Sequence, residues 1–492
     1  MHYKLQDIPQ DFSRVKNIFF VGIKGVGMTP LAIIAKQAGF NIAGSDISEE
    51  FITDNSLNYE EIIIFEEFDE KDIELFFEGF EKDENLVVTT GAHKGFDNPQ
   101  SNWARNKGIT VLTQGQALGI FMEGEIFDRS FKSIAVAASH GKTTISALLA
   151  SALVSLSQDP TYTVGTGELF PVGSPGHYGV GEYFIAEADE YASEPVYDKV
   201  PKFLYQNPEF AIFNNIDFDH PDLFKDIEEV KKAFFEFAHN IKSNGILFTN
   251  GDDKYLQELK KEINKDIRII TYGKLVSNDY VITKFVNEGF ESRFTVLKHG
   301  KEIGVFELGL PGIHNAHNSL SVIALLLEFG FEASEIRHSL KTFKGTKRRM
   351  EIIGKTNEGA LIIDDYAHHP LEISTTLDAI KNAVFDKKIV AIFQPHTTSR
   401  TKALLSEFAE SFSEVEKLIL LPVFKSQRDT EKDNLSKDEY VSSFKVQNDV
   451  ILIENFSDVV KYVRENYASG GFVFVTIGAG DVYKIAYELT KE

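Results

Sequence analysis

The stretch SIAVAASHGKTT, residues 133–144, joins an apolar strand to the helix-forming segment ISALLASALVSL, residues 145–156. In a strand-loop-helix unit of this kind, backbone N–H groups and the helix N-terminus bind phosphate groups. Lys142 is placed to reach the β and γ oxygens of ATP, and Thr143 is placed to ligate Mg²⁺. Val136 occupies the first glycine position of the full GxxxxGK[ST] pattern, so the alternative is a helix start without a ligand.

Short apolar runs alternate with amphipathic stretches along the rest of the chain. This alternation is typical of α/β layers with mostly parallel sheets. Residues 280–308 instead alternate apolar and polar side chains in three short runs, which predicts antiparallel strands attached to the middle of the protein. The apolar runs are residues 17–21, 86–90, 134–138, 210–214, 362–364, 389–393 and 472–477.

The length of 492 residues is too great for one ordinary core, and a spacing of roughly 150 residues per domain suggests about three domains. Three of the apolar runs end in Gly-rich or acidic turns, at Val21, Ala138 and Ile363. Each is expected to open a domain, with binding residues beyond the carboxyl ends of its strands. New units begin near Phe131 and near Lys347. The predicted domains are therefore residues 1–130, 131–346 and 347–492.

Charge and composition exclude several classes of protein. Lys and Arg number 51 and Asp and Glu number 74, so the net charge of −23 argues against nucleic acid as a partner. The absence of cysteine excludes disulfides, thiolate zinc sites and a cysteine nucleophile. No apolar run approaches the ~18 residues that span a bilayer, and the N-terminal MHYKLQDIPQDFSRVKN lacks the apolar core of a secretory signal. We therefore expect a cytoplasmic protein without a membrane partner.

Two acidic elements follow the phosphate loop. EADE, residues 187–190, comes after the apolar YFIA, so its carboxylates are expected at the end of a strand. The run FAIFNN leads into IDFDH, which places Asp217, Asp219 and His220 in one turn. Hard oxygen ligands with one imidazole suit Mg²⁺ or Mn²⁺ bridging phosphate to substrate. Each element alone is more often a solvated turn, but in this order behind a phosphate loop they predict a metal site.

These motifs, together with others, resemble those of the Mur ligase family, the ATP-dependent amino acid and peptide ligases of bacterial cell-wall synthesis. The resemblance implies an α/β protein with a Rossmann-like UDP-sugar domain, a central P-loop ATPase-like domain and a Rossmann-like C-terminal domain for the incoming amine. It covers nearly the whole chain and rests on GIKGVGM (22–28), GSD (44–46), HGKTT (140–144), EADE (187–190), NNIDFDH (214–220), PGIHNAHN (311–318), KRRME (347–351), DDYAHHP (364–370), QPHTTSRT (394–401) and GAGD (478–481).

The resemblance also implies roles for single positions. The implied catalytic residues are Lys142, Glu187, His220 and Arg349, and the implied ligands of Mg²⁺ are Thr143, Glu187 and His220. ATP is expected to contact Ser139, His140, Gly141, Lys142, Thr143, Thr144, Asn315, Asn318, Arg349 and Asp365. The UDP-sugar is expected to contact Gly22, Gly25, Val26, Gly27, Met28, Asp46 and His93. The incoming amine is expected to contact Tyr366, His368, His369, His396 and Arg400.

Transfer of the γ-phosphoryl group of ATP turns a carboxylate into a good acyl donor, which an amine then attacks. Catalysis would consist mainly of positioning and of charge neutralisation by Lys142, Mg²⁺ and Arg349. His368 and His369 are candidates to orient the amine, and the alternative for this pair is packing ahead of a proline.

Within the family, the form of GIKGVGM resembles members that act on UDP-N-acetylmuramate. Two activities share that acceptor: one adds L-alanine, and the other, that of murein peptide ligase, attaches a recycled L-Ala-γ-D-Glu-meso-diaminopimelate tripeptide. The first loop, DNPQ (97–100), QPHTTSRT and GAGD resemble the alanine-adding members, whereas EYASEPVYDKVPKF (190–203) resembles the recycling members. Because the C-terminal domain is expected to select the amine, we favour L-alanine, with the tripeptide as the alternative. A monomer and a homodimer are both compatible with the sequence.

Two other classes compete with a ligase. The strand at residues 17–21, its Gly-rich turn and Asp46 also fit a dinucleotide-dependent oxidoreductase, but the glycines run GxxGxG rather than GxGxxG. A hydride-transferring enzyme also has no use for HGKTT. The second competitor is a non-catalytic nucleotide-binding scaffold, because Ala138 and Ser139 replace the family's usual glycine and threonine in the loop.

Overall fold

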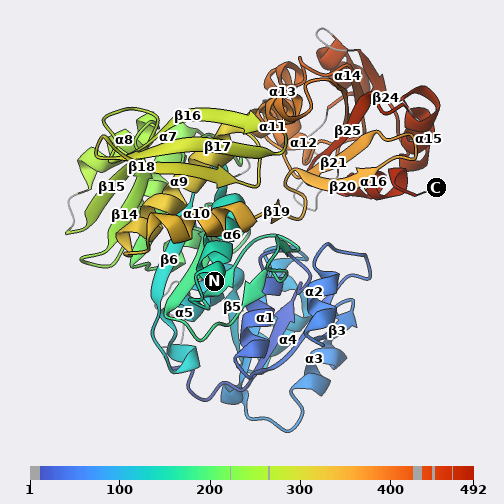
Figure 1. Cartoon of the computed structure of the whole chain (residues 1–492). Helices are drawn as coiled ribbons and strands as arrows, with labels where there is room; N and C mark the ends of the chain where they lie inside the picture. Colours follow the sequence, from blue (N-terminus) through green and yellow to red (C-terminus); the bar gives the residue numbers. More distant parts are fainter. Residues whose placement is uncertain are drawn as a thin grey trace.

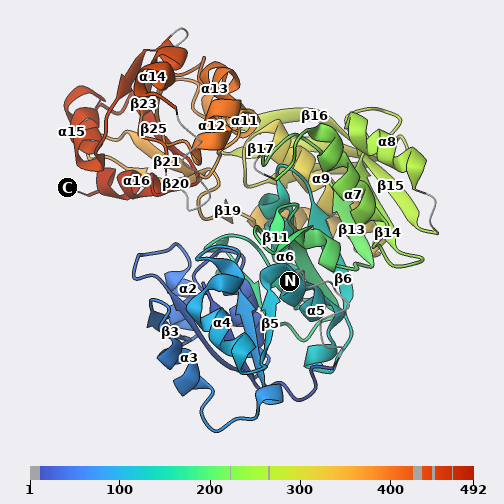
Figure 2. The same cartoon turned by 180° about the vertical axis from the view of Figure 1, so that it is seen from behind.

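The computed structural model describes residues 11–221, 223–263, 266–424, 435–445, 449–467 and 469–491. The first part of the segment predicted not to be a secretory signal, residues 1–10, lies outside these ranges. Figure 1 shows three bodies in chain order, with the N-terminal one in blue, the middle one from cyan to yellow and the C-terminal one in orange and red. Figure 2 gives the view from behind, in which the C-terminal body again adjoins the middle body near α11, β16 and β17.

The N-terminal body is a five-stranded parallel sheet in the order β3-β2-β1-β4-β5, with helices on its faces. Strands β1 and β4 are buried at every position, as expected for a parallel sheet covered on both sides. Helix α5 begins with a capping box between Thr113 and Gln116. The elements are β1 Asn17–Val21, α1 Thr29–Gln37, β2 Asn41–Asp46, α2 Asp54–Tyr59, β3 Ile63–Glu66, α3 Glu70–Phe76, η2 Lys82–Glu84, β4 Asn85–Thr89, η3 Gly95–Asp97, α4 Pro99–Asn106, β5 Thr110–Thr113, α5 Gln114–Glu123 and η4 Glu125–Phe127.

The middle body is a ten-stranded sheet in the order β18-β17-β16-β15-β14-β13-β6-β10-β7-β9. Its centre is parallel, and β16, β17 and β18 extend it as antiparallel strands, which confirms the prediction for residues 280–308. The elements are β6 Lys132–Ala137, α6 Lys142–Ser155, β7 Thr161–Thr163, β8 Leu169–Phe170, β9 Gly176–His177, β10 Tyr183–Ala188, β11 Ala192–Glu194, β12 Asp198–Pro201, η5 Lys202–Tyr205, β13 Phe210–Phe213, α7 Ile227–Ala238, β14 Ile246–Asn250, α8 Lys254–Glu262, β15 Arg268–Gly273, β16 Tyr280–Glu288, β17 Glu291–Lys298, β18 Lys301–Leu308, α9 Ile313–Glu328, α10 Ala333–Thr342 and β19 Gly345–Thr346.

The C-terminal body is a six-stranded sheet in the order β20-β21-β25-β22-β23-β24, parallel except for the edge strand β20. Helix α11 has Pro370 in its first turn, where a missing N–H is tolerated. The elements are β20 Glu351–Lys355, β21 Leu361–Asp365, α11 Pro370–Ala383, β22 Lys388–Phe393, α12 Thr398–Ala403, α13 Leu405–Ser411, β23 Lys417–Leu420, α14 Lys437–Lys445, β24 Val450–Leu452, α15 Phe456–Tyr467, β25 Phe472–Ile477 and α16 Tyr483–Leu489.

The predicted apolar runs coincide with β1, β4, β6, β13, β21, β22 and β25 to within two residues at either end. The α/β fold class with mostly parallel sheets is therefore confirmed. The exact borders at residues 130 and 346 stay a prediction, although each sheet lies inside one of the three predicted domains. Within the described residues, no helix has both the length and the apolar character to cross a bilayer.

The N-terminal and middle bodies pack closely against each other. Helix α1 lies against β7 and β9, and α5 lies against η5. A β-carbon at Gly119, in α5, would overlap the carbonyl oxygen of Tyr205, in η5. The glycine therefore lets the helix backbone approach the neighbouring body closely.

Replacement of Gly119 by alanine is expected to destabilise the protein by about 1–3 kcal/mol, because the added methyl group forces α5 and η5 apart. In an unconstrained helix the same change would stabilise by roughly 0.5–1 kcal/mol, so the sign of the change tests the contact. Chemical unfolding measures it. Gly471→Ala is the control, because a β-carbon there would meet only Ser469 Oγ at 3.7 Å. A stabilised Gly119→Ala protein would contradict the packing described.

Candidate functional site

The phosphate loop lies between the end of β6 and the start of α6. Gly141 precedes the helix with φ of 89°, a conformation that glycine adopts without strain. The end of β13 fixes the loop, because Ser139 N donates to Asn215 O at 3.1 Å and His140 N donates to Asn215 Oδ1 at 2.8 Å. The Ser139 hydroxyl in turn accepts from Asp217 N at 2.9 Å. The N-terminus of α6 therefore faces the interface, here called the seam, between the middle and C-terminal bodies.

Lys142 is half-buried, with 15% of its side chain exposed, and already carries two hydrogen bonds. Its Nζ donates to Ala138 O at 2.6 Å and to Glu190 Oε2 at 2.7 Å, which leaves one of its three donors for a ligand. Burial alone would lower the pKa of Lys142, but the carboxylates of Glu190 and Asp189 raise it above its usual value. The ammonium is therefore charged and oriented.

Glu190 is a residue to which the sequence analysis gave no role, although it closes the quoted EADE motif. Its side chain is only 2% exposed, and Oε1 has no hydrogen-bond partner among the described residues. Burial raises the pKa of Glu190. A buried carboxylate oxygen without a partner is costly, so this atom is suited to receive a cation or a donor from a ligand.

Thr143 and Glu187, both predicted metal ligands, lie together. Thr143 Oγ1 donates to Glu187 Oε2 at 3.3 Å, and Gly165 N donates to Glu187 Oε1 at 2.7 Å. His220, the third predicted ligand, reaches this region through Glu190, because its Nε2 lies 3.9 Å from Glu190 Oε1. A hydroxyl group, two carboxylates and an imidazole fit a hard divalent cation such as Mg²⁺.

Arg400, a predicted amine-binding residue, forms an ion pair with Asp219 of the middle body. Its Nε and Nη2 donate to Asp219 Oδ1 at 3.0 and 2.8 Å, and Nη2 lies 3.4 Å from His220 Nδ1. Both charged side chains are buried. Although burial opposes it, His220 and Arg400 hold the pKa of Asp219 well below its usual value. This ion pair therefore joins the C-terminal body to the turn that carries His220.

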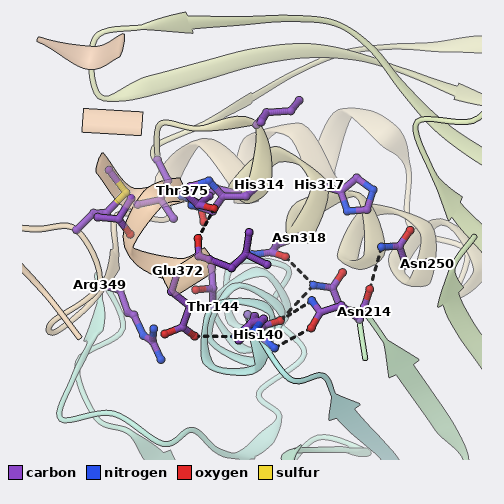
Figure 3. A pocket seen from close by; sticks show the side chains of 18 of the residues that line it. His140, Thr144, Asn214, Asn250, His314, His317, Asn318, Arg349, Glu372 and Thr375 are labelled. Carbon is purple, nitrogen blue, oxygen red and sulfur yellow. Dashed lines mark hydrogen bonds and ion pairs between the residues drawn. The ribbon is translucent and has the colours of Figure 1, made fainter. Parts of the chain in front are cut away.

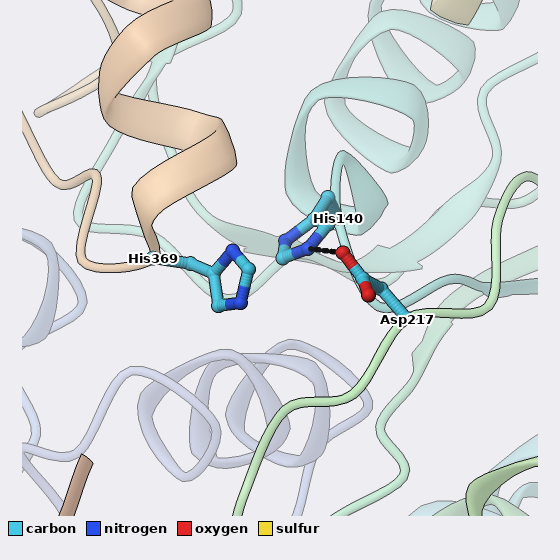
Figure 4. A group of neighbouring side chains, drawn as sticks. All are labelled: His140, Asp217 and His369. Atoms are coloured by element: carbon cyan, nitrogen blue, oxygen red, sulfur yellow. Dashed lines mark hydrogen bonds and ion pairs between the residues drawn. The ribbon is translucent and has the colours of Figure 1, made fainter. Parts of the chain in front are cut away.

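A second polar contact crosses the same seam at His140. Its Nδ1 lies 3.1 Å from Glu372 Oε1, in α11, and its Nε2 lies 3.3 Å from Asp217 Oδ2. Figure 4 shows the ring of His369 facing His140, with a centroid distance of 4.6 Å. The ligand atoms of His140, Asp217 and His369 lie within 4.8 Å of one another, but the two carboxylates around His140 favour a proton there over a metal ion.

The other predicted amine residues lie along the start of α11 and beyond β22. His368 Nδ1 lies 3.1 Å from Tyr366 O, and burial lowers the pKa of His368 to about 4, so its ring is neutral. The guanidinium group of Arg349 lies over the ring of Tyr366 at 5.3 Å. His396 stacks on Phe424 at 5.4 Å. Tyr366, His368 and His369 are thus contiguous, whereas the stacking partner of His396 lies beyond β23.

A cavity of about 510 Å³ opens beside the phosphate loop, between α9 of the middle body and α11 of the C-terminal body (Figure 3). Asn315 and Asn318 have fixed amides: Asn315 Nδ2 donates to Pro311 O at 2.8 Å, and Asn318 Oδ1 accepts from Asn214 Nδ2 at 3.0 Å. Burial raises the pKa of Asp365 to about 6. The predicted ATP residues that line the cavity are His140, Gly141, Thr144, Asn315, Asn318, Arg349 and Asp365.

The sequence analysis did not identify several residues of this cavity. His314 and His317 lie within the quoted PGIHNAHN motif, so their neighbours Asn315 and Asn318 were a usable signal. The remaining ones come from distant turns and from α11, and no local pattern marks them. They include Asn250, Asp252, Lys274, Glu372 and Thr375.

The Gly-rich loop of the N-terminal body is stabilised by Asp46. Its two carboxylate oxygens accept from Lys24 N at 2.8 Å and Ile47 N at 2.9 Å, and His93 Nε2 lies 3.5 Å from Oδ1. Burial raises the pKa of Asp46. Both oxygens accept hydrogen bonds inside the loop, so Asp46 holds the loop backbone in place.

The other predicted UDP-sugar residues form the turn between β1 and α1. Gly22 has φ of 80°, and Gly25 N donates to its carbonyl oxygen at 3.3 Å. Gly27 O accepts from Gln114 Nε2 at 3.3 Å. Val26 is half-buried, and Met28 is buried immediately before α1.

Three family descriptions match consecutive parts of the chain. Residues 17–125 match "Mur ligase family, catalytic domain", residues 136–326 match "Mur ligase middle domain", and residues 348–480 match "Mur ligase, glutamate ligase domain". The chain is 37% identical to a UDP-N-acetylmuramate–L-alanine ligase of Desulfitobacterium hafniense strain Y51, over 96% of this chain and 99% of the relative.

Solved structures of related proteins have the same architecture. The UDP-N-acetylmuramate-alanine ligase MurC of Thermotoga maritima aligns with a TM-score of 0.76 at 25% identity, covering 96% of this chain and 98% of its own. A murein peptide ligase of Psychrobacter arcticus 273-4 aligns with a TM-score of 0.71 at 24% identity, over 96% of this chain and 98% of its own. At 24% identity, the second likeness concerns the fold alone.

The contact of His140 with two carboxylates predicts a specific dependence of stability on pH. Burial alone would lower the pKa of His140, but Asp217 and Glu372 outweigh it and raise the pKa from 6.5 to about 10. A raised pKa means that the folded state binds the proton more tightly than the unfolded state. The stabilisation is complete below pH 6.5 and is lost as the pH rises through about 10.

His140→Asn is therefore expected to destabilise the protein at pH 6.5 and to have a smaller effect at pH 10. The free energy of unfolding of the variant and the parent, measured by denaturant at both values, gives this difference. His299→Asn, at an exposed position, is the control. An equal loss of unfolding free energy at both pH values would show that His140 shares no proton with Glu372 across the seam.

Proposed function

The chain belongs to the Mur ligase family of ATP-dependent ligases, and on this premise we propose that it joins L-alanine to the carboxyl group of UDP-N-acetylmuramate. The observation that carries the proposal is the 37% identity, over 96% of the chain, with a relative named for this reaction. The presence of a phosphate loop next to a carboxylate cluster is chemical support for the same reaction. The reaction consumes ATP and releases ADP and phosphate as the amide bond forms.

Each body receives one substrate in this proposal. Residues 1–130 bind the UDP-sugar on the loop of GIKGVGM, with Asp46 and His93 stabilising that loop. Residues 131–346 bind ATP, and residues 347–492 bind the amine. The carboxyl ends of the central strands of all three sheets are the expected positions for ligands.

Lys142 and Arg349 act on the phosphate groups. Lys142 directs its remaining N–H donor at the transferring phosphoryl group, and Arg349 approaches from the C-terminal body beside Asp365 and Glu372. Both side chains are half-buried, and fixed charges in such surroundings stabilise developing negative charge more strongly than they would in water.

Mg²⁺ fits the group formed by Thr143, Glu187 and His220, with Glu190 adjacent. When bound there, Mg²⁺ would neutralise charge between ATP and the substrate carboxylate. The protein's own part is to keep Thr143 on Glu187 and to hold His220 in place through Asp219 and Arg400. Closure of the C-terminal body is thereby linked to the order of the metal site.

The murein peptide ligase alternative rests on residues 190–203. In the structure this stretch forms β11 and β12 and lies against the N-terminal body, where Tyr197 Oη donates to Asp97 Oδ2 at 2.7 Å. Its first residues, Glu190 and Tyr191, lie at the turn of His220, whereas the rest of the stretch contacts the N-terminal body. The motifs of the C-terminal body, which is expected to select the amine, resemble those of the alanine-adding ligases. For this reason we favour L-alanine over the tripeptide. The cytoplasmic location and the oligomeric state stay predictions.

An assay of phosphate release tests the function. With UDP-N-acetylmuramate and Mg²⁺-ATP, L-alanine is expected to support turnover with a higher kcat/KM than L-Ala-γ-D-Glu-meso-diaminopimelate, because the C-terminal motifs resemble those of alanine-adding ligases. A preference for the tripeptide would assign the recycling activity instead. No release with either amine would favour the non-catalytic scaffold.

Lys142→Ala is expected to lower kcat by a factor on the order of 10²–10³, the usual loss when one donor to the transition state is removed. Lys132→Ala is the matched control, because Lys132 lies at the other end of β6 and pairs with Glu182 at the surface. An unchanged turnover of Lys142→Ala would contradict the whole assignment.

His220→Ala is expected to raise the Mg²⁺ concentration for half-maximal turnover by about tenfold or more, as loss of groups around a metal does. The measurement is a Mg²⁺ titration at saturating ATP. His299→Ala, on an exposed turn, is the control. Unaltered metal dependence of His220→Ala would make this histidine structural.

A further inference from the structure

We propose that Lys202 binds the carboxylate group of the sugar acid and makes the site selective for an acidic nucleotide sugar. This inference rests on the proposed function, because it assumes that UDP-N-acetylmuramate lies between the N-terminal and middle bodies. The sequence analysis gave Lys202 no role, although it lies within the quoted stretch of residues 190–203. The argument uses its position, its unused hydrogen-bond donors and the charge of its neighbours.

Lys202 lies where the N-terminal and middle bodies meet. It begins η5, which packs against α5 of the N-terminal body. A β-carbon at Gly115, in the first turn of α5, would lie 3.1 Å from both Cα and Cβ of Lys202. The glycine therefore lets the backbone of Lys202 lie directly against the start of α5. The side chain is 23% exposed, so it is not sealed between the two bodies.

Two backbone hydrogen bonds fix Lys202 beside the EADE motif. Lys202 N donates to Tyr191 O at 2.9 Å, and Phe203 N donates to Asp189 O at 3.0 Å. The side chain points the same way, because its Nζ donates to Asp189 Oδ2 at 2.8 Å. An ammonium group has three donors, and this is the one hydrogen bond that Nζ makes with the described residues. Two donors therefore remain for a ligand.

Two buried acceptor atoms near Lys202 also lack a hydrogen bond. Gln114 is the first residue of α5, and its Nε2 donates to Gly27 O at 3.3 Å, whereas its Oε1 has no partner among the described residues. Glu190 Oε1, in the EADE motif, is in the same state. Buried polar atoms are normally paired, so ligand groups are expected beside both atoms. The unused polar groups thus run from the Gly-rich turn, through Gln114 and Lys202, to the EADE motif.

The charge of the EADE motif explains why an acidic substrate needs a cation here. The motif holds three carboxylates, those of Glu187, Asp189 and Glu190, and a further carboxylate beside them is repelled. Lys142 already serves the transferring phosphoryl group. Lys202 adds a cation on the side of the N-terminal body, where it can form a charge-assisted hydrogen bond to the substrate acid. The diphosphate belongs instead at the Gly-rich turn before α1, so the carboxylate is the anionic group left for Lys202.

Calorimetric binding of UDP-N-acetylmuramate and of UDP-N-acetylglucosamine to the full-length protein tests the proposal. The second ligand keeps the nucleotide, the diphosphate and the sugar but has no carboxylate. Lys202→Met is expected to weaken binding of the acid roughly tenfold, the lower end for a hydrogen bond to a charged group, and to leave binding of the neutral sugar unchanged. Lys199→Met is the matched control, because Lys199 is exposed on the adjoining β12.

Three results would overturn the proposal. They are unchanged affinity of Lys202→Met for UDP-N-acetylmuramate, an equal loss for the two nucleotide sugars, and an equal loss in Lys199→Met. If Lys202→Met does not fold, Lys202→Gln, which keeps an N–H donor for Asp189, decides by the same comparison. Failure of the parent protein to bind UDP-N-acetylmuramate at all would instead refute the proposed function, so the two failures are distinguishable.

Discussion

The seam between the middle and C-terminal bodies depends on the desolvation of charge. Glu190, Asp219 and Arg400 are buried and Lys142 is 15% exposed, and a buried charge is tolerated only beside a partner of opposite sign. Each of these groups therefore fixes the position of another. The phosphate loop is thereby fixed to Glu190 within the middle body, and the turn of His220 is fixed to α12 of the C-terminal body.

Ion pairs of this kind fix the positions of side chains more than they increase the free energy of unfolding. The attraction between buried partners roughly offsets the loss of their hydration, whereas removal of one partner leaves an uncompensated charge. The Arg400–Asp219 pair therefore serves more to position His220 than to stabilise the interface between the domains. Domain closure and ordering of the metal-binding groups become one event.

Much of the fold was predictable because its signals are local. The buried strands are short apolar runs, and the runs near Val21, Ala138 and Ile363 end in turns with chemical character. The phosphate loop was predictable for the same reason. Contacts between residues far apart in the chain were not, because Glu190 against Lys142 and Arg400 against Asp219 join residues 48 and 181 positions apart. His314 was missed although it adjoins Asn315, since its place in the cavity opposite α11 arises only in the folded chain.

The buried apolar clusters divide the molecule differently from the sheets. One continuous cluster joins side chains of the N-terminal body, such as Phe20 and Leu31, to Phe131, Phe184 and Phe213 of the middle body. The two clusters of the C-terminal body draw their buried members only from residues 350–489. Cooperative melting follows shared apolar cores. The first two bodies should therefore lose their structure as one thermodynamic unit, while the third forms a separate unit.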